Sequence, residues 1–327
     1  MASGRKTKAG VTAGILAATL CIWLCGCSQA PLLSQREIVH GVFFQLDGEE
    51  HTAVLLLADQ PAGTEGNDAG YKTAVGTGGT PEQALEQAEG SLDGQVFYGL
   101  MDLAVLPGEG SWETVTSLGR LLYEKTQPAP QFTLFLMRNQ SGREWTKDAA
   151  DLYEKMESAL AKYGIRNGLQ LLFSAQNECA LPLWQGTGYG FVFLQKGRPN
   201  IVLEEELSAQ LAAVLCGQAD RLSCSFSRGT AAVESKVMVQ HRVQEQGDAT
   251  FYLTLEDPEL QELSTAGREE ETLQQKLSAA LEEAFGQITA QSCAPGFDPL
   301  RISVWVWAAR GSVNPLPPLQ LQVAFEA

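Results

Sequence analysis

The stretch LAVLPGEGSWETVTSLGRLLYEKTQPAPQFTLFLM, residues 103–137, decides the fold that we predict for this chain. Two short apolar runs, at residues 103–106 and 132–137, flank a segment in which apolar residues recur at helical spacing. A helix between two such runs favours an α/β layer in which part of the sheet is parallel. The residues on the apolar face of the predicted helix are Val115, Leu118 and Leu122.

The same alternation continues on both sides of this stretch. Upstream, residues 38–48 end in Asp-Gly ahead of the apolar residues 52–57, which predicts a hairpin. A helix then starts at Thr80, because Pro81 suits its first position and Gln83 completes a capping box. Downstream, a helix over residues 146–163 ends at Gly164.

The pattern of predicted elements changes near Gly186, from alternating strands and helices to mostly strands. Residues 189–194, 201–203, 222–226, 231–243 and 250–256 are predicted strands, with a short helix over residues 204–215. Residues 258–292 carry the longest helical pattern, and residues 302–307 and 319–325 are predicted to be terminal strands. The apolar stripe of the long helix consists of Leu273, Leu277, Leu281, Phe285 and Ile288.

These patterns predict a mixed α/β chain of the α+β class with two folded parts. Residues 36–184 form the first, an α/β domain, and residues 185–327 form an antiparallel-sheet domain packed by one long helix. The predicted loop at Gly76-Thr77-Gly78-Gly79 precedes the first helix and lacks both P-loop and GxGxxG spacing, so we interpret it as loop and cap.

The N-terminus carries the pattern of an export signal. Cations at Arg5, Lys6 and Lys8 precede an apolar segment, residues 11–24, which is shorter than the about 20 apolar residues of a spanning helix. Leu24-Cys25-Gly26-Cys27 fits a lipobox, so we predict a signal peptide over residues 1–26, cleavage between Gly26 and Cys27, and a tether over residues 27–35. Acylation of Cys27 on nitrogen and sulfur (N-acyl, S-diacylglycerol) would anchor the chain stably. An ordinary secretory signal or an uncleaved anchor helix is the alternative.

The net charge and the cysteine count limit the partners and the disulfides that we expect. The formal net charge of −16 disfavours nucleic acid as a partner, and it predicts that the body stands away from anionic headgroups, with the lipid as main attachment. Cys179, Cys216, Cys224 and Cys293 are even in number and could form two disulfides, although we favour free or buried thiols.

No enzymatic motif is evident in the sequence. Three histidines, His40, His51 and His241, lack metal-ligand spacing, and HExxH and GxSxG are absent, so we predict neither a metal nor a cofactor nor catalytic residues. The acidic runs at residues 204–206 and 269–271 are interpreted as solvated helix starts. Trp305 and Trp307 are expected to share one face of a strand, as packing residues or as a docking pair for a membrane partner.

Four stretches, taken in order after the lipobox, resemble the C subunits of spore germination nutrient receptors, the Ger(x)C lipoproteins. They are residues 36–47 (REIVHGVFFQLD), 80–85 (TPEQAL), 96–106 (VFYGLMDLAVL) and 190–197 (GFVFLQKG). Met101-Asp102 stands where the family has basic residues.

The resemblance implies a protein that is not an enzyme. It implies a lipid-anchored subunit on the outer face of the spore inner membrane, associated with integral-membrane A and B receptor subunits in a complex that responds to small nutrients. The acylated Cys27 is the residue whose role carries over. A solute-binding lipoprotein of a transporter is the alternative, and it predicts two similar lobes around a cleft. An envelope hydrolase is a third reading, against which the missing nucleophile motif argues.

Overall fold

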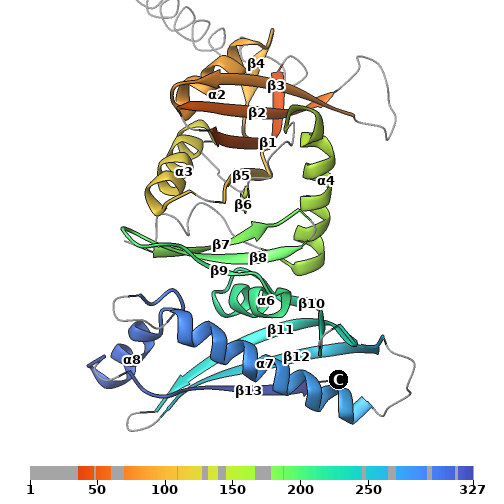
Figure 1. Cartoon of the computed structure of the whole chain (residues 1–327), viewed down its shortest axis with the longest axis vertical. Coiled ribbons are helices and arrows are strands. Elements are labelled where there is room, and N and C mark those ends of the chain that lie inside the picture. The colour runs from red at the N-terminus through yellow and green to blue at the C-terminus, as the bar shows by residue number, and fades with distance from the viewer. Residues whose placement is uncertain are drawn as a thin grey trace, which may run out of the picture.

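The structure is a computed structural model that describes most of the chain after residue 35. The described residues are 36–47, 49–59, 70–108, 110–126, 132–138, 145–165, 178–186, 188–227, 229–244, 248–263, 270–292, 297–313 and 316–326. The predicted signal peptide and tether lie outside these ranges. Within them the molecule is elongated, with one sheet toward each end and helix α6 (Glu206–Leu215) between the two sheets (Figure 1).

The first sheet combines antiparallel and parallel strands. Its nine described strands run in the order β3-β2-β1-β5-β6-β7-β8-β9, and the short β4 pairs with β1. Pairing is parallel from β1 through β5, β6 and β7 and antiparallel on either side, so the predicted parallel layer is confirmed. The strands are β1 (Arg36–Asp47), β2 (Glu50–Asp59), β3 (Gly70–Gly78), β4 (Gln95–Phe97), β5 (Leu103–Pro107), β6 (Thr133–Met137), β7 (Glu178–Trp184), β8 (Tyr189–Gln195) and β9 (Ile201–Leu203).

Helices cover both faces of this sheet. Helices α2 (Pro81–Gly90) and α3 (Trp112–Thr126) pack on one face, where Leu85 and Leu122 are fully buried with residues of β1, β2 and β5. Helix α4 (Trp145–Tyr163) packs on the other face, where Met156 is fully buried. Sandwiching between helices explains why β5 and β6 are apolar throughout rather than alternating.

Strand β3 corrects the predicted loop at residues 76–79. Thr80 does cap α2, since its Oγ1 accepts a hydrogen bond from the Gln83 N–H at 3.2 Å, but Gly76 and Gly78 lie within β3. A Cβ atom on Gly76 would lie 2.1 Å from the Ala84 carbonyl oxygen. These glycines therefore allow α2 to pack directly against the strand, which is a packing requirement rather than a loop feature.

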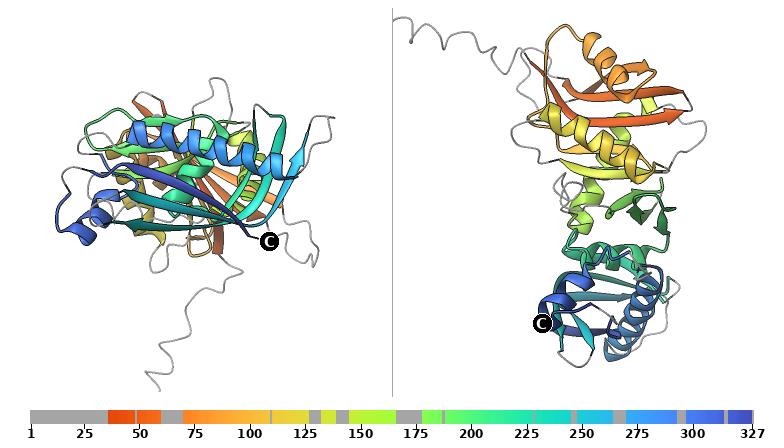
Figure 2. Two further views of the ribbon diagram at one scale, coloured as in Figure 1. Left: turned by 90° about the horizontal axis from the view of Figure 1, so that it is seen from below. Right: turned by 90° about the vertical axis from the view of Figure 1, so that its left-hand side faces the viewer.

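The second sheet has four described strands in the order β10-β11-β12-β13. They are β10 (Arg221–Phe226), β11 (Ala231–Val243), β12 (Ala249–Glu262) and β13 (Leu319–Glu326). The sheet was predicted to be antiparallel throughout, but β12 and β13 pair in parallel. Helix α7 (Glu270–Ser292) is shorter than the helical pattern predicted over residues 258–292, because β12 continues to Glu262. The helix crosses one face of this sheet (Figure 2). All five residues of its predicted stripe are buried, and each contributes about 2 kcal/mol.

A helix, α8 (Ile302–Arg310), replaces the strand predicted at residues 302–307. Ile302 and Val306 are buried while Val304, halfway between them, is 57% exposed, which fits a helix and not a strand. Trp305 and Trp307 therefore do not share a face. Trp305 stacks on His241 at 3.7 Å between ring centroids, whereas Trp307 is 62% exposed.

The boundary between the two sheets differs from the predicted one. Strands β8 and β9 pair with β7 and with each other, so the first sheet continues to Leu203 rather than ending near Trp184. Helix α6 follows directly, and every described residue from Leu207 to Leu215 is buried because the first sheet, β10 and α7 surround it. The chain is thus a mixed α+β protein whose two sheets share one continuous core. Its division into two domains stays a proposal.

Candidate functional site

The predicted lipidation site lies outside the residues that the structure describes. Cleavage between Gly26 and Cys27 and acylation of Cys27 therefore stay predictions. Strand β1 begins at Arg36, nine residues after Cys27, and an extended chain of that length spans at most roughly 30 Å. Across the described residues, we find no helix with the length and apolar character needed to cross a membrane.

The three histidines occupy separate environments. His51 lies across the hairpin from Leu46, with a buried Nδ1 that has no hydrogen-bond partner, and His241 stacks on Trp305. His40 lies on β1 beside Asp102, 3.8 Å from its Nδ1 to the Asp102 Oδ2. The described ranges contain no cluster of three or more His, Cys, Asp or Glu side chains placed to hold a metal ion.

His40 belongs to a polar and aromatic cluster that four separate elements bring together. Tyr153 of α4 donates a hydrogen bond of 2.7 Å from its hydroxyl to the Asp102 Oδ2, just before β5. Tyr71 of β3 packs edge-on against both His40 and Tyr153, at centroid distances of 5.9 and 5.1 Å. Asp102 is positioned by its backbone, because its N–H donates to the His40 carbonyl and its carbonyl accepts from the Thr133 N–H.

The electrostatics of this cluster keep its tyrosines protonated. Burial, and then the hydrogen bond to Asp102, raises the pKa of Tyr153, while burial and the nearby Glu157 raise the pKa of Tyr71. The Asp102 side chain is about half exposed. The cluster can bind a polar group at the surface through the Asp102 carboxylate, the protonated tyrosine hydroxyls and the ring faces. It contains no activated nucleophile.

Sequence reasoning did not assemble this cluster. His40 and Asp102 lie in two of the stretches that resemble the germination family, whereas Tyr71 lies on β3, a strand that was not predicted. Tyr153 neighbours Leu152 on the predicted helix, and its burial could have been anticipated from the helical period alone.

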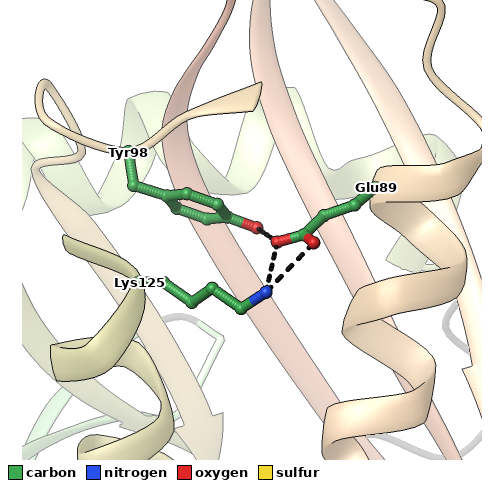
Figure 3. Close-up of polar contacts among 3 residues, drawn as sticks. All are labelled: Glu89, Tyr98 and Lys125. Carbon is green, nitrogen blue, oxygen red and sulfur yellow. Dashed lines mark hydrogen bonds and ion pairs between the residues drawn. The ribbon is translucent and has the colours of Figure 1, made fainter. Parts of the chain in front are cut away.

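A second polar cluster joins α2, α3 and the segment after β4 (Figure 3). The Tyr98 hydroxyl donates to the Glu89 Oε1 at 2.7 Å, and the Lys125 ammonium lies 3.0 Å from the same carboxylate. Burial, and then the bond to Glu89, raises the pKa of Tyr98. Because all three side chains are largely buried and satisfied by one another, the cluster fastens the two helices rather than offering a binding site.

A pocket of ≈ 310 Å³ lies where α4 and α6 meet the second sheet. Carboxylates of Glu206, Glu234 and Glu259 line it with the ammonium of Lys162. Glu206 is engaged, since its Oε1 accepts hydrogen bonds from Tyr163 at 3.1 Å and from the Gln210 amide at 3.3 Å. The pocket is acidic and polar, and Glu206 in its wall links α4 to α6.

The acidic runs and the thiols have structural roles. Glu205 caps α6, where its Oε2 accepts from the Ser208 N–H at 3.2 Å, as predicted for a helix start. Helix α7 begins at Glu270, within the second run. Cys179, Cys216 and Cys224 are free, and Cys293 lies outside the described residues. Burial raises the pKa of Cys224 to about 12, so its thiol is unreactive at neutral pH.

The fold has a likeness to a solved structure, whereas the sequence comparisons find no match. No family model matches the chain, and no curated protein matches it. Among solved structures, the one titled "Crystal Structure of the GerBC protein" is similar over 88% of this chain and 96% of that chain, with 9% identity and a TM-score of 0.46. This is a likeness of fold. At this identity and TM-score it does not extend to ligands, partners or function.

Proposed function

We propose that this chain is a lipid-anchored, non-catalytic subunit of a spore nutrient germinant receptor, acting in assembly and signalling during germination. The anchor is Cys27, and the expected location is the extracytoplasmic face of the spore inner membrane. Integral-membrane A and B subunits are the expected partners, and a small nutrient is the expected ligand of the complex as a whole.

One observation carries this proposal. The four stretches that resemble the germination family all fall in the first sheet and its helix α2, as β1, the start of α2, the segment from β4 through β5, and β8. In the fold β1 pairs with both β4 and β5, so two of the stretches, residues 36–47 and 96–106, are in direct contact. Together with the lipobox in front of them, these stretches support the proposal of a folded unit anchored at a membrane.

Two features weigh against a solute-binding lipoprotein. That class has two similar lobes around a ligand cleft. Here one part has a nine-stranded mixed sheet and the other a four-stranded sheet, and the buried helix α6 fills the space between them.

A hydrolase is disfavoured because neither polar cluster contains a serine or cysteine beside a base.

Deletion of the gene in its own spore-forming host tests the receptor role. We expect deletion spores to lose the response to at least one nutrient and to regain it with the wild-type chain. Neighbouring genes for a transporter-like membrane protein and a second membrane protein would support the role. Deletion spores that germinate normally on every nutrient tested, or an ATP-driven importer cassette beside the gene, would contradict it.

Metabolic labelling with palmitate tests the anchor separately. Cys27→Ala should abolish labelling and release the protein from the membrane fraction, whereas Cys25→Ala is a matched control that keeps a small residue before the cleavage site and should label normally. A Cys27→Ala chain that still carries palmitate would overturn the assignment of the anchor.

A further inference from the structure

The acidic pocket beside α4 and α6 has a regular floor made by three neighbouring strands. Ser223 of β10 is opposite Glu234 of β11, and Glu234 is in turn opposite Glu259 of β12. All three line the pocket, and the next row of the floor consists of Ser225, Ala232 and Gln261. Residues two apart on a strand share one face, so the two rows are directed to the same side. The volume of ≈ 310 Å³ suits a small molecule.

Glu234 and Glu259 place two like charges side by side. Both are exposed, and neither side chain has an ion pair or a hydrogen bond with a described residue. Carboxylates directly opposite each other on neighbouring strands repel, so this pairing is unfavourable unless a cation lies between them. Arg221 and Lys236 oppose each other in the row beyond, outside the pocket lining, and neither forms a described ion pair with these glutamates.

The ammonium group in the described lining is associated with the third carboxylate instead. Lys162 donates a hydrogen bond of 3.3 Å from its Nζ to the Tyr163 hydroxyl, and that hydroxyl donates to the Glu206 Oε1 at 3.1 Å. The Lys162 ammonium also lies over the Tyr163 ring, 4.8 Å from its centroid. Glu206 thus has a cation nearby, whereas the Glu234 and Glu259 pair has none bound to it.

A buried hydroxyl in the same row is also without a partner. The side chain of Ser223 lines the pocket and is 6% exposed, yet its hydroxyl forms no hydrogen bond with a described residue. The two bonds between Ser223 and Gln210 involve only the backbone of Ser223. Hydroxyls buried to this extent nearly always have a partner, so the pocket is missing a donor or acceptor beside Glu234.

We propose that this pocket binds a small organic ammonium compound. Its ammonium group would lie between the carboxylates of Glu234 and Glu259 and donate its third hydrogen bond to the Ser223 hydroxyl. The alkyl part of the molecule would then extend over Ala232 in the second row. A bare metal ion fits less well, because the described residues contain no group of three or more His, Cys, Asp or Glu side chains placed to hold one.

The inference goes beyond the proposed function and does not depend on it. Binding is measured on the isolated full chain in detergent micelles, with 4-amino-1-butanol as the probe. Butane-1,4-diol, which has the same size and no ammonium group, is the control compound. We expect the amine to raise the unfolding temperature in a saturable manner and the diol to leave it unchanged.

A pair of double variants tests the two carboxylates. Glu234→Gln with Glu259→Gln should weaken the affinity for 4-amino-1-butanol, measured by titration calorimetry, at least about fivefold. Glu82→Gln with Glu86→Gln removes the same charge from α2, on the first sheet, and should leave the affinity unchanged. Equal effects of the amine and the diol on wild type would overturn the proposal, as would full affinity in the Glu234→Gln, Glu259→Gln variant.

A third variant tests the buried hydroxyl. Ser223→Ala should weaken binding at least about twofold without lowering the unfolding temperature of the free protein, because the hydroxyl that it removes has no partner there. Two other outcomes would assign the pocket differently and overturn the proposal. One is a larger stabilisation by Mg²⁺ than by the amine that requires Glu234 and Glu259. The other is protection of residues 231–234 from hydrogen exchange in native membranes but not by the amine, which would indicate a protein partner. These readouts involve neither germination nor palmitate, so their failure is distinguishable from failure of the receptor role.

Discussion

Gln210 of α6 completes the hydrogen bonding of Ser223 on β10. The Gln210 Nε2 donates to the Ser223 carbonyl at 3.1 Å, and the Gln210 Oε1 accepts from the Ser223 N–H at 2.8 Å. Both residues are buried, and β10 is an edge strand of the second sheet. The side-chain amide thus replaces a neighbouring strand at this point and joins the helix between the sheets to the second sheet.

Replacement of Gln210 by alanine should destabilise the chain by about 2–4 kcal/mol, since it leaves a buried N–H and a buried carbonyl without partners and creates a cavity. Urea unfolding of the full chain, followed by tryptophan fluorescence, measures this change. Gln240→Ala, on the exposed side of β11, is the control and should lie within about 0.5 kcal/mol of wild type. Equal stability of the two variants would show that water satisfies Ser223 instead.

The stability of the protein should fall above pH 10, and Tyr98 should account for part of the fall. Burial raises the pKa of Tyr98 in the folded state, whereas an unfolded chain ionises tyrosine near 10.0. Above that pH the unfolded state has lost a proton that the folded state retains, so the free energy of unfolding decreases by about 1.4 kcal/mol per pH unit for each such group.

Above pH 10, Tyr98→Phe should therefore reduce the loss of unfolding free energy by about 1.4 kcal/mol per pH unit. At neutral pH the variant should be less stable than wild type, because it lacks the hydrogen bond to Glu89. The comparison is made by urea unfolding at several pH values between neutrality and pH 11. Tyr123→Phe, at a position 39% exposed, serves as the control. An unchanged slope in Tyr98→Phe would contradict the raised pKa.

Periodicity alone located the elements whose burial follows a regular pattern. The stripe from Leu273 to Ile288 is buried against the second sheet, as a helical repeat of apolar residues requires. The prediction of a strand at residues 302–307 was wrong. Ile, Val and Trp favour strands locally, but tertiary contacts override that preference here. Burial of Ile302 and Val306, and a cap from Asp298 outside the helix, are not visible in a local pattern.

The candidate sites were less accessible to sequence analysis than the fold. The cluster of His40, Asp102, Tyr71 and Tyr153 draws on four elements that are far apart in the chain. Strand β3, which contributes Tyr71, was missed because Gly76 and Gly78 resemble loop residues, and only the close approach of α2 explains them. Motif order indicated which segments belong together, but it could not indicate which side chains meet.

The free thiols should resist modification until the protein unfolds. Burial raises the pKa of Cys216 and of Cys224 to about 12, and it raises the pKa of Cys179 as well, so little thiolate is present at pH 8. Maleimide labelling with mass spectrometric mapping should find these three cysteines unmodified in native protein and modified in urea. Rapid native labelling of Cys224, or a disulfide between any two of the three, would contradict this arrangement.

Asp298 should control the order of the first turn of α8. Its Oδ1 and Oδ2 accept hydrogen bonds of 2.7 Å from the N–H groups of Ile302 and Ser303, while Arg301 between them has a positive φ of 54°. Asp298→Ala removes both acceptors and should cost about 0.5–2 kcal/mol, chiefly by fraying the first turn. Hydrogen exchange of the amides at residues 302–306 should accelerate, whereas Asp151→Ala, which removes an exposed ion pair with Lys155 on α4, should not change it. Unchanged exchange at these amides in Asp298→Ala would contradict the capping role of Asp298.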